Sequence, residues 1–364
     1  MKRLSYGAGL FALTATTALA GGIDRSGQSV GVIFESGNYA EFSFGLVSPD
    51  VSGVAVPLAG GAPSGDMAGN YAQFSGAYKH QFSDAVSAAI IVDQPFGADV
   101  DYPVGTGYYA AGATAKLKTL ATTGVVKYTM PSNLSVYGGV RYQTLSAVVS
   151  VPFVAGYTGD GARDGSFGYL LGVAWEKPEI ALRVALTYNS KIKHEIDTTE
   201  NSLLGPLTSI TTVETPKSVN LDFQSGVAKD TLVFGSVRWV DWSNFDITPA
   251  QYQGITGGSL VSYANDTVSY TLGVGRRFND HWSGAVTLGY EGAHGGFASN
   301  LGPTDGYRSI GLGATYTQDN MKITGGVRYV SIGKAQTQLG AIAPAANFTD
   351  NSGIGVGLKL GFSF

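Results

Sequence analysis

Six basic side chains stand at alternate positions within apolar stretches of the sequence. They are Arg141, Arg183, Arg238, Lys322, Arg328 and Lys359. Successive side chains of a strand point to opposite faces, so these cations would share one face and their apolar neighbours the other. Several cations in a partly dry interior could bind an anionic head group, such as a carboxylate, through charge-assisted hydrogen bonds.

A structural role is the alternative for each of these cations. Acidic companions on the same face, chiefly Glu41 and Glu291, would let ion pairs tie neighbouring strands together. The interior of a closed sheet in a membrane is polar whether or not it binds a ligand. The candidate ligand-binding residues are Arg141, Arg183, Arg238 and Arg328.

Other chemistries have little support in the sequence. There are four histidines, His80, His194, His281 and His294. They are predicted at strand ends or in loops without ligand spacing, where they would be solvated rather than bound to a metal. Cysteine is absent, so the chain has no disulfide and no thiolate ligand. A Gly-x-Gly-x-Gly repeat at 353–357 falls inside a predicted strand, and no nucleophile elbow is found. No catalytic residue, metal site or cofactor is predicted.

Strands are the elements that must position the cations. Apolar and polar residues alternate about fourteen times along the chain, with turn residues between the alternating stretches. The alternation is clearest at the C-terminal end, where one face comprises Ile354, Val356, Leu358, Leu360, Phe362 and Phe364. The larger apolar residues would face lipid and the small or polar residues a lumen. The sequence therefore predicts an all-β protein, a transmembrane antiparallel β-barrel of about fourteen strands.

The predicted connections alternate between two kinds. Short polar turns are predicted at 81–85, 130–133, 177–179, 229–230, 278–280 and 318–320. Long connections rich in Gly, Pro, Ala and Thr are predicted at 49–69, 95–114, 151–165, 196–215, 242–264, 292–305 and 333–351. Short turns at one rim and long loops at the other are typical of bacterial outer-membrane barrels, with both termini on the periplasmic side.

Composition supports strands and turns. The chain has 52 Gly, 20 Tyr and 17 Phe, and only 14% of its residues are charged. No uncharged apolar run after residue 20 is long enough for a transmembrane helix, which argues against a helical membrane protein. The formal net charge of −4 argues against nucleic acid as a partner.

The N-terminal end divides into two segments. Residues 1–20 are predicted to be a cleaved signal peptide, because Lys2 and Arg3 precede an uncharged stretch that ends in the small-x-small site Ala18-Leu19-Ala20. Residues 21–38 are predicted to be a short plug in the lumen, followed by the barrel at 39–364. The apolar plug residues are Ile23, Val32, Ile33 and Phe34, and Asp24, Arg25 and Glu35 would pair with lumen charges. A flexible periplasmic tail is the alternative, because termini fray unless tied down.

Four blocks of sequence carry a family resemblance. In chain order they are Ser48-Pro49-Asp50-Val51, Gln94-Pro95-Phe96-Gly97, the stretch 167–178 followed by 186–194, and Thr215-Pro216-Lys217-Ser218 leading to 237–245. Together they resemble the long-chain fatty acid transporters of the outer membrane, the FadL family. The resemblance covers most of the chain after the signal peptide.

The resemblance implies a fourteen-stranded barrel with an N-terminal hatch in the lumen. It implies passive uptake of a fatty acid, a hydrocarbon or another hydrophobic compound, without a cofactor and without enzymatic activity. The chain departs from the family pattern because it lacks an Asn-Pro-Ala hatch signature and because 151–165 has no room for a long helical hairpin. These departures leave the substrate open. A general diffusion porin, or a structural outer-membrane barrel without specific cargo, is the alternative.

Two further expectations concern the surface of the barrel. Phe362 and Phe364 are predicted to be an assembly signal for the barrel assembly machinery, because the last strand must pair with the first to remove both edges. Outer-membrane lipids would surround a monomer. Aromatic residues of the outer loops would form either a landing site for hydrophobic ligands or part of an interfacial girdle; they are Tyr102, Tyr108, Tyr109, Phe153 and Tyr157.

Overall fold

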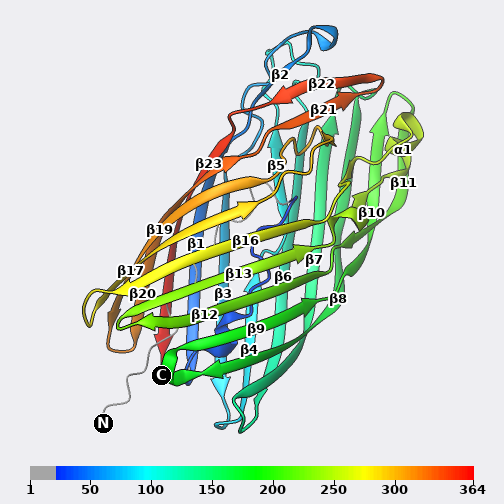
Figure 1. Ribbon diagram of the computed structural model, residues 1–364. Coiled ribbons are helices and arrows are strands. Elements are labelled where there is room, and N and C mark those ends of the chain that lie inside the picture. The colour runs from blue at the N-terminus through cyan, green and yellow to red at the C-terminus, as the bar shows by residue number, and fades with distance from the viewer. Residues whose placement is uncertain (1–21) are drawn as a thin grey trace.

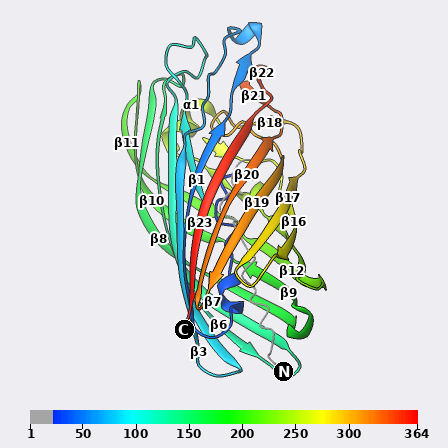
Figure 2. The ribbon, with the colours of Figure 1, turned by 90° about the vertical axis from the view of Figure 1, so that its left-hand side faces the viewer.

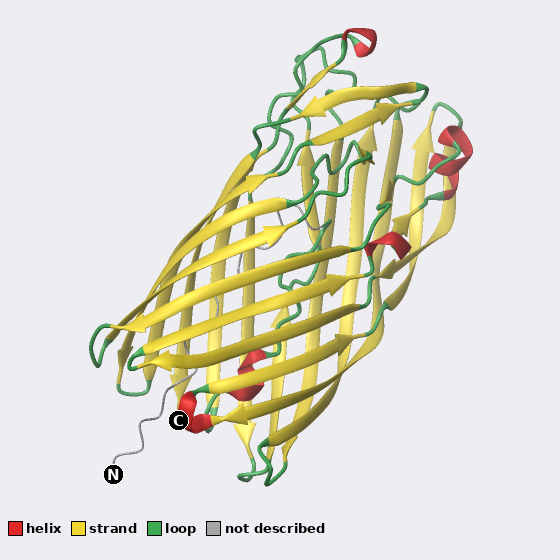
Figure 3. Cartoon of the chain, in the orientation of Figure 1, coloured by secondary structure: helices red, strands yellow, loops and turns green. Residues whose placement is uncertain are grey.

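One antiparallel sheet wraps round until its two ends pair (Figure 1, Figure 3). The computed structural model describes residues 22–364, so the predicted signal peptide and Gly21 lie outside the described residues. β1 (Tyr39–Asp50) pairs with β23 (Ser352–Ser363), from Tyr39 opposite Ser363 to Asp50 opposite Ser352. This pairing closes the barrel and leaves no free edge between the first and last strands. No helix within 22–364 has the length and apolar character needed to cross a membrane.

Over the described range the barrel has fourteen staves, a stave being one passage of the chain along the wall, and this count confirms the prediction. Besides β1 and β23, the unbroken staves are β3 (Tyr71–Gln81), β6 (Thr114–Thr129), β7 (Leu134–Val151), β8 (Tyr157–Lys177), β13 (Thr231–Val240), β16 (Thr267–Arg277), β17 (Trp282–Glu291), β19 (Tyr307–Gln318) and β20 (Met321–Ile332). The interrupted staves are β4 (Val86–Asp93) with β5 (Gly97–Asp101), β9 (Leu182–Asn189) with β10 (Ile192–Ser202), and β11 (Gly205–Thr215) with β12 (Ser218–Ala228).

Local sequence explains the interruptions. Pro95 separates β4 from β5, and Pro216 separates β11 from β12. Proline has no N–H to donate to a ladder and is therefore found at bulges and edges of sheets. Between β9 and β10 the Ser190 hydroxyl accepts the Tyr169 N–H at 2.9 Å, so a side chain replaces a backbone partner there.

The two rims differ as the sequence predicts. Short turns lie at the rim that holds the C-terminus, and longer connections lie at the opposite rim (Figure 1). Two of the predicted long loops are wrong, however, because most of 151–165 belongs to β8 and most of 196–215 forms the β10–β11 hairpin. The outward positions of β10 carry charged residues, including Lys193, Glu195 and Asp197. The apolar outward face that identifies a membrane strand in sequence is lost there, because this part of the wall extends beyond the apolar band.

The long connections build a second, smaller structure at their rim. β2 (Gly53–Ala55), β22 (Ile342–Phe348), β21 (Ala335–Leu339) and β18 (Phe297–Ala298) form a four-stranded sheet there. The other short elements are η1 (Gly31–Phe34), η2 (Pro57–Ala59), η3 (Pro178–Ile180), η4 (Trp242–Asn244), β14 (Asp246–Ile247), β15 (Val261–Ser262) and α1 (Ala250–Thr256). Phe348 and Tyr102 belong to a buried cluster shared by these connections, so this end of the barrel has its own hydrophobic core.

The outer surface of the barrel is apolar along its middle. Residues that alternate with small or polar ones are exposed there, such as Leu288 on β17 and Ile354, Val356 and Leu358 on β23. Figure 2 shows β23 running beside β1 and β20 along this wall. Exposed aromatic residues lie near the short-turn rim; they are Tyr78, Phe82, Tyr128, Trp175, Phe278, Trp282 and Phe364. An apolar band with aromatic residues at its border fits a lipid bilayer.

Residues 22–38, called here the N-terminal segment, run inside the barrel. η1 contacts β3, β4 and β6, so the segment lies against one side of the lumen. Its apolar residues join a buried cluster with wall residues such as Ile91 and Val125. At the short-turn rim Lys79 donates to the backbone oxygens of Glu35 at 2.5 Å and Gly37 at 3.0 Å. Strands β12 to β23, on the opposite side of the lumen, contribute no residue to this buried apolar cluster.

Candidate functional site: two lumen cavities separated by the N-terminal segment

The barrel wall is incomplete between β3 and the β4–β5 stave. β3 pairs with β4 from Gly76 onward, and Ala68 bridges Val100 higher up, but the described residues between these points form no ladder across the gap. The N-terminal segment supplies partners from inside. Arg25 N donates to Pro95 O at 2.8 Å, and Gly97 N donates to Ile23 O at 2.8 Å. The break at Pro95 therefore serves as the attachment point of the segment.

The Arg25 side chain lies at the gap. Its guanidinium carbon is 3.9 Å from the centre of the Tyr71 ring on β3, which is within cation–π distance. Gly97 makes room for this arginine, because a Cβ built at Gly97 would lie 2.5 Å from Arg25 Nε. A larger residue at 97 would therefore displace the Arg25 side chain from its present position.

An apolar cavity of about 80 Å³ lies in the lumen on the long-loop side of this attachment point. Its lining is mainly aliphatic. Side chains from the wall and from Ile23 meet side chains from the connection between β13 and β16, and they include Leu117, Leu145, Val149, Ile196, Val213, Phe245, Ile247 and Leu260. Such a surface favours an uncharged, water-insoluble body, because burying apolar area is the main favourable contribution it offers.

The connection between β13 and β16, residues 241–266, covers the apolar cavity and is called here the lid. Glu200 on β10 anchors it. The Glu200 carboxylate accepts the backbone N–H groups of Gln251 at 2.9 Å and Tyr252 at 3.1 Å, which are unsatisfied donors at the start of α1. It also accepts the Tyr157 hydroxyl at 3.0 Å. Because Glu200 is fully buried, these charge-assisted bonds fix the lid to the wall.

Trp242 joins the lid to the N-terminal segment. Its ring is fully buried and packs edge-on against Phe96, with ring centres 5.8 Å apart, and against Phe245 at 5.4 Å. Gly22 lies against the same ring with a φ of +63°, and a Cβ there would be 2.8 Å from Trp242 Cε2. Both the backbone angle and the close approach therefore require glycine.

A layer of polar side chains bounds the apolar cavity on the short-turn side. Its central contact is an ion pair in which Arg238 Nε lies 2.6 Å from Asp24 Oδ2. The other Arg238 donors reach Asn220 Oδ1 at 2.6 Å, Ser218 Oγ at 3.0 Å and Gln28 Oε1 at 3.2 Å. Residues from the N-terminal segment and from β12 and β13 are thus held together in one network.

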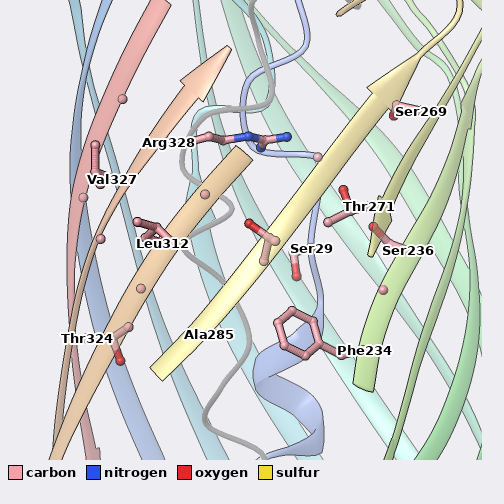
Figure 4. Close-up of a pocket in the computed structure, with 18 of the residues that line it drawn as sticks. Ser29, Phe234, Ser236, Ser269, Thr271, Ala285, Leu312, Thr324, Val327 and Arg328 are labelled. Carbon is pink, nitrogen blue, oxygen red and sulfur yellow. The ribbon is translucent and has the colours of Figure 1, made fainter. Parts of the chain in front are cut away.

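Beyond this layer lies a polar cavity of about 140 Å³. It separates the N-terminal segment from the β12–β23 wall, whose inward residues are mostly Ser, Thr, Gly and Ala; examples are Ser236, Ser269, Thr271, Ala285, Thr324 and Gly355. Figure 4 shows Ser29 of the segment across the cavity from Thr271, with Phe234 and Arg328 also at its border. Small hydroxyl-bearing side chains leave space that water can occupy.

Strand β13 crosses all three regions on one inward face. Val240 belongs to the apolar cluster, Arg238 forms the ion pair, and Ser236 lines the polar cavity. Inward residues of a strand recur about every 7 Å. The surroundings of β13 therefore change from apolar to polar between Val240 and Ser236, which are two inward positions apart.

The other candidate cations also point into the lumen but have different partners. Arg141 donates to Thr123 Oγ1 at 2.9 Å and Asn189 Oδ1 at 3.1 Å. Arg183 lies over the Phe34 ring at 4.6 Å. Arg328 donates to Ser309 Oγ at 2.7 Å. The two candidate lysines form ion pairs, Lys359 with Glu41 at 3.0 Å and Lys322 with Glu35 at 3.5 Å. The structure thus brings Arg238 and Asp24 together but does not gather the four arginines at one point.

Two buried carboxylates that hold the site were missed by the sequence analysis. Asp93 accepts a hydrogen bond from Ser26 of the N-terminal segment, and Glu200 anchors the lid. Alternation gives a signal for both, because Asp93 follows the inward residue Ile91 and Glu200 follows the inward residue Thr198. Glu200 was not identified as a lumen residue because a long connection was predicted at 196–215.

The prediction of solvated histidines is wrong for His194. This side chain is fully buried on β10, with Nδ1 2.8 Å from Asp164 Oδ2 and Nε2 3.2 Å from Gln143 Nε2. The error follows from the predicted end of the strand, since His194 lies mid-strand on the inward face. Within 22–364 no three His, Cys, Asp or Glu side chains are close enough to hold a metal ion.

The outer-loop aromatic residues do not form an exposed surface. Tyr102, Tyr108 and Tyr157 are buried, and Tyr102 stacks on Tyr108 with ring centres 5.5 Å apart. Burial, together with the neighbouring Tyr102 phenol, raises the pKa of Tyr108 well above its ordinary value. Tyr102 donates its hydroxyl to Asn300 O at 2.6 Å, so this group joins two connections rather than presenting an open landing site.

The predicted plug and assembly residues have clear positions. Val32, Ile33 and Phe34 of η1 are buried in the cluster against β4 and β6, and the Phe34 ring meets the Tyr137 ring edge-on at 5.6 Å. Ile23 lines the apolar cavity. On the last strand, Phe362 lies outward opposite Ala40 of β1. The Phe364 ring stacks on Tyr78 at 5.9 Å.

Comparison with known proteins gives one family and several similar folds. A family model described as outer membrane protein transport protein (OMPP1/FadL/TodX) matches residues 36–364. A solved FadL homologue of Pseudomonas aeruginosa is 14% identical, with a TM-score of 0.75, and the match covers 96% of this chain and 98% of that one. The toluene transporter TodX of P. putida is 15% identical, with a TM-score of 0.66 and 90% of each chain covered. The toluene transporter TbuX of Ralstonia pickettii is 14% identical, with a TM-score of 0.63 and the same coverage. No curated protein matches the sequence.

Proposed function

The chain belongs to the OMPP1/FadL/TodX family of outer-membrane transport proteins, and we propose that it takes up hydrophobic small molecules by passive diffusion through the barrel. The observation that carries this proposal is the apolar cavity, because aliphatic side chains line it from the wall, the N-terminal segment and the lid. The candidate ligand classes are fatty acids and monoaromatic hydrocarbons. The transport of toluene by structurally similar proteins supports the second class.

Transport is tested by uptake across an outer membrane that contains or lacks the barrel. Toluene should enter faster when the barrel is present, whereas a hydrophilic solute of similar size should not. Equal acceleration of both solutes would favour the alternative function, a general diffusion porin. No acceleration of either solute would favour a structural barrel without cargo.

Residues 21–38 act, in this proposal, as a plug that keeps the barrel closed to ions. Support comes from the cluster around Val32, Ile33 and Phe34, and from the ion pairs of Asp24 and Glu35 with the wall. A free periplasmic tail would have no reason to bury these apolar residues. The presence of this segment argues against an open general porin.

The wall gap provides an exit in this proposal. The apolar cavity and the space beside the gap share lining residues, among them Ile23 and Ala98. A hydrophobic ligand could therefore pass sideways into the membrane when the Arg25 and Tyr71 side chains separate, without entering water. Arg25→Ala should speed the release of toluene, while Arg277→Ala, which changes an arginine at the short-turn rim, should not. Equal release rates in the two variants would contradict this exit.

The lumen arginines bias the cargo toward anions in this proposal. Arg141, Arg183, Arg238 and Arg328 are the residues concerned. Arg141→Ala combined with Arg238→Ala should lower uptake of a fatty acid more than uptake of an uncharged hydrocarbon of similar size. A hydrogen bond to a charged group contributes roughly 1.5–3 kcal/mol, so the fall in carboxylate affinity should be about tenfold or more. Equal losses for both cargoes would indicate a purely structural role.

Members of this family are transport channels, and we extend this to propose that the chain itself catalyses no reaction. We also propose that it is a monomer surrounded by outer-membrane lipids, and that the barrel assembly machinery recognises Phe362 and Phe364. The positions of both side chains on the outer surface support this role, since Phe362 points outward on β23 and the exposed Phe364 ring stacks on Tyr78.

A further inference from the structure

We propose that Ile23 and Asp24 together occupy the place of an anionic amphiphile, so that the Asp24 carboxylate is a tethered competitor for ligand carboxylates at Arg238. This inference rests on the proposed function, because it concerns the same lumen. The added element is a ligand with a carboxylate head group, which would enter by replacing the Asp24 carboxylate at Arg238.

The surroundings of Arg238 are those of a carboxylate-binding site. Among its hydrogen-bond acceptors Asp24 carries a formal charge, while Asn220, Ser218 and Gln28 are neutral. Both charged side chains are less than a tenth exposed. Asp24 gives Arg238 a directly hydrogen-bonded carboxylate, whereas Asp93 and Asp222 act on Arg238 electrostatically. Loss of the direct partner of a buried guanidinium is strongly unfavourable, so Asp24 should leave most readily when another anion replaces it.

Ile23, the residue before Asp24, takes the place of the apolar body of the amphiphile. Ile23 lines the apolar cavity with its side chain, while the next residue in the chain reaches Arg238. On the wall, Val240 of the apolar cluster is the inward neighbour of Arg238 along β13, at a distance of about 7 Å. A ligand with a short apolar body and one carboxylate could therefore place its body in the cavity and its head group on Arg238.

The exchange would also connect the two cavities. The ion pair forms part of the layer between them, because Arg238 and Ser26 line the polar cavity while Ile23 lines the apolar one. When a ligand carboxylate takes the place of Asp24, the N-terminal segment loses its ionic contact with β13. An uncharged hydrocarbon cannot make this exchange. The ion pair would thus discriminate between two ligand classes. Carboxylates would open the polar layer, and hydrocarbons would not.

The test is calorimetric titration of the purified full barrel with two matched probes, hexanoate and hexan-1-ol. Asp24→Asn removes the competing charge but keeps the shape of the side chain. It should tighten hexanoate binding about tenfold, the change expected from one charge-assisted hydrogen bond, and leave hexan-1-ol binding unchanged. Adding Arg238→Gln to this variant should abolish the gain. Asp197→Asn, an exposed position on β10, makes the same change in net charge and should have no effect.

Three results would overturn the inference. They are unchanged hexanoate affinity in Asp24→Asn, an equal gain for both probes, and the same gain in Asp197→Asn. Circular dichroism and the heat-modifiable shift of the folded barrel on gels establish that each variant is folded before titration. If hexan-1-ol still binds and toluene uptake persists, only the competitor role fails. If neither probe binds and the barrel does not accelerate toluene entry, the proposed transport function fails with it.

Discussion

Asp24 and Arg238 are 214 positions apart in the sequence and form an ion pair of 2.6 Å inside the barrel. The pair joins the N-terminal segment to β13, which is the ninth stave in chain order when β1 is counted as the first. Removing one member of a buried pair typically costs about 3–5 kcal/mol, because the other charge is left without compensation. The N-terminal segment is therefore expected to depend on this contact for its position.

Replacing residues 24–35 with a Gly/Ser linker of equal length should turn a nearly silent barrel into one that conducts ions. The linker keeps the chain length but removes the side chains that pack against β4 and β6 and pair with Arg238. Single-channel conductance in planar bilayers measures the effect, and sensitivity to small hydrophilic antibiotics provides a second readout. Unchanged conductance in a folded variant would show that the segment does not obstruct the lumen.

Glu200→Gln should loosen the lid without unfolding the barrel. The carboxylate accepts the N–H groups of Gln251 and Tyr252, and a weaker acceptor reduces each charge-assisted bond. A loss of about 1.4 kcal/mol in local stability corresponds to tenfold faster exchange of those amide hydrogens. Hydrogen exchange followed by mass spectrometry measures this. Glu195→Gln, whose side chain points outward on the same strand, is the matched control, and equal protection of the lid in both variants would contradict the anchoring role.

Deleting Phe362–Phe364 should abolish membrane insertion while leaving export intact. The deletion removes the partners of Tyr39 and Ala40 on β1, and of Met321 on β20, where the barrel closes. Heat-modifiable migration on gels distinguishes the folded barrel from the unfolded chain. A deletion of Gly105 and Thr106, which lie in the connection between β5 and β6, serves as the control. Normal levels of folded barrel after the C-terminal deletion would rule out an assembly signal.

The barrel could be predicted from the sequence because alternate residues of a stave face different surroundings. Lipid favours large apolar side chains on one face, and the lumen favours small or polar ones on the other. Ile354 and Val356 point outward while Gly355 and Gly357 point inward, and this contrast repeats in most staves. The prediction failed in the β10–β11 hairpin, where the outward face is polar. There the alternation of Ile196 with charged residues resembles a loop, although the strand continues.

The site itself depends on contacts between distant segments, which alternation does not specify. The inward direction of Arg238 follows from its strand, but its pairing with Asp24 requires the path of the N-terminal segment to be known. The apolar cavity requires the lid to fold over the lumen so that Phe245 and Leu260 reach the wall. No local pattern in 241–266 indicates this path, since it depends on the anchor at Glu200.

Transport through the apolar cavity is tested most directly by the rate of toluene entry through a barrel whose cavity has been filled. Val149→Trp adds an indole to the cavity lining, whereas Val140→Trp places the same group on the exposed outward face of the same strand. Val149→Trp should reduce entry to the rate seen without the barrel, and Val140→Trp should leave it unchanged. Undiminished entry through folded Val149→Trp barrels would contradict transport through the apolar cavity.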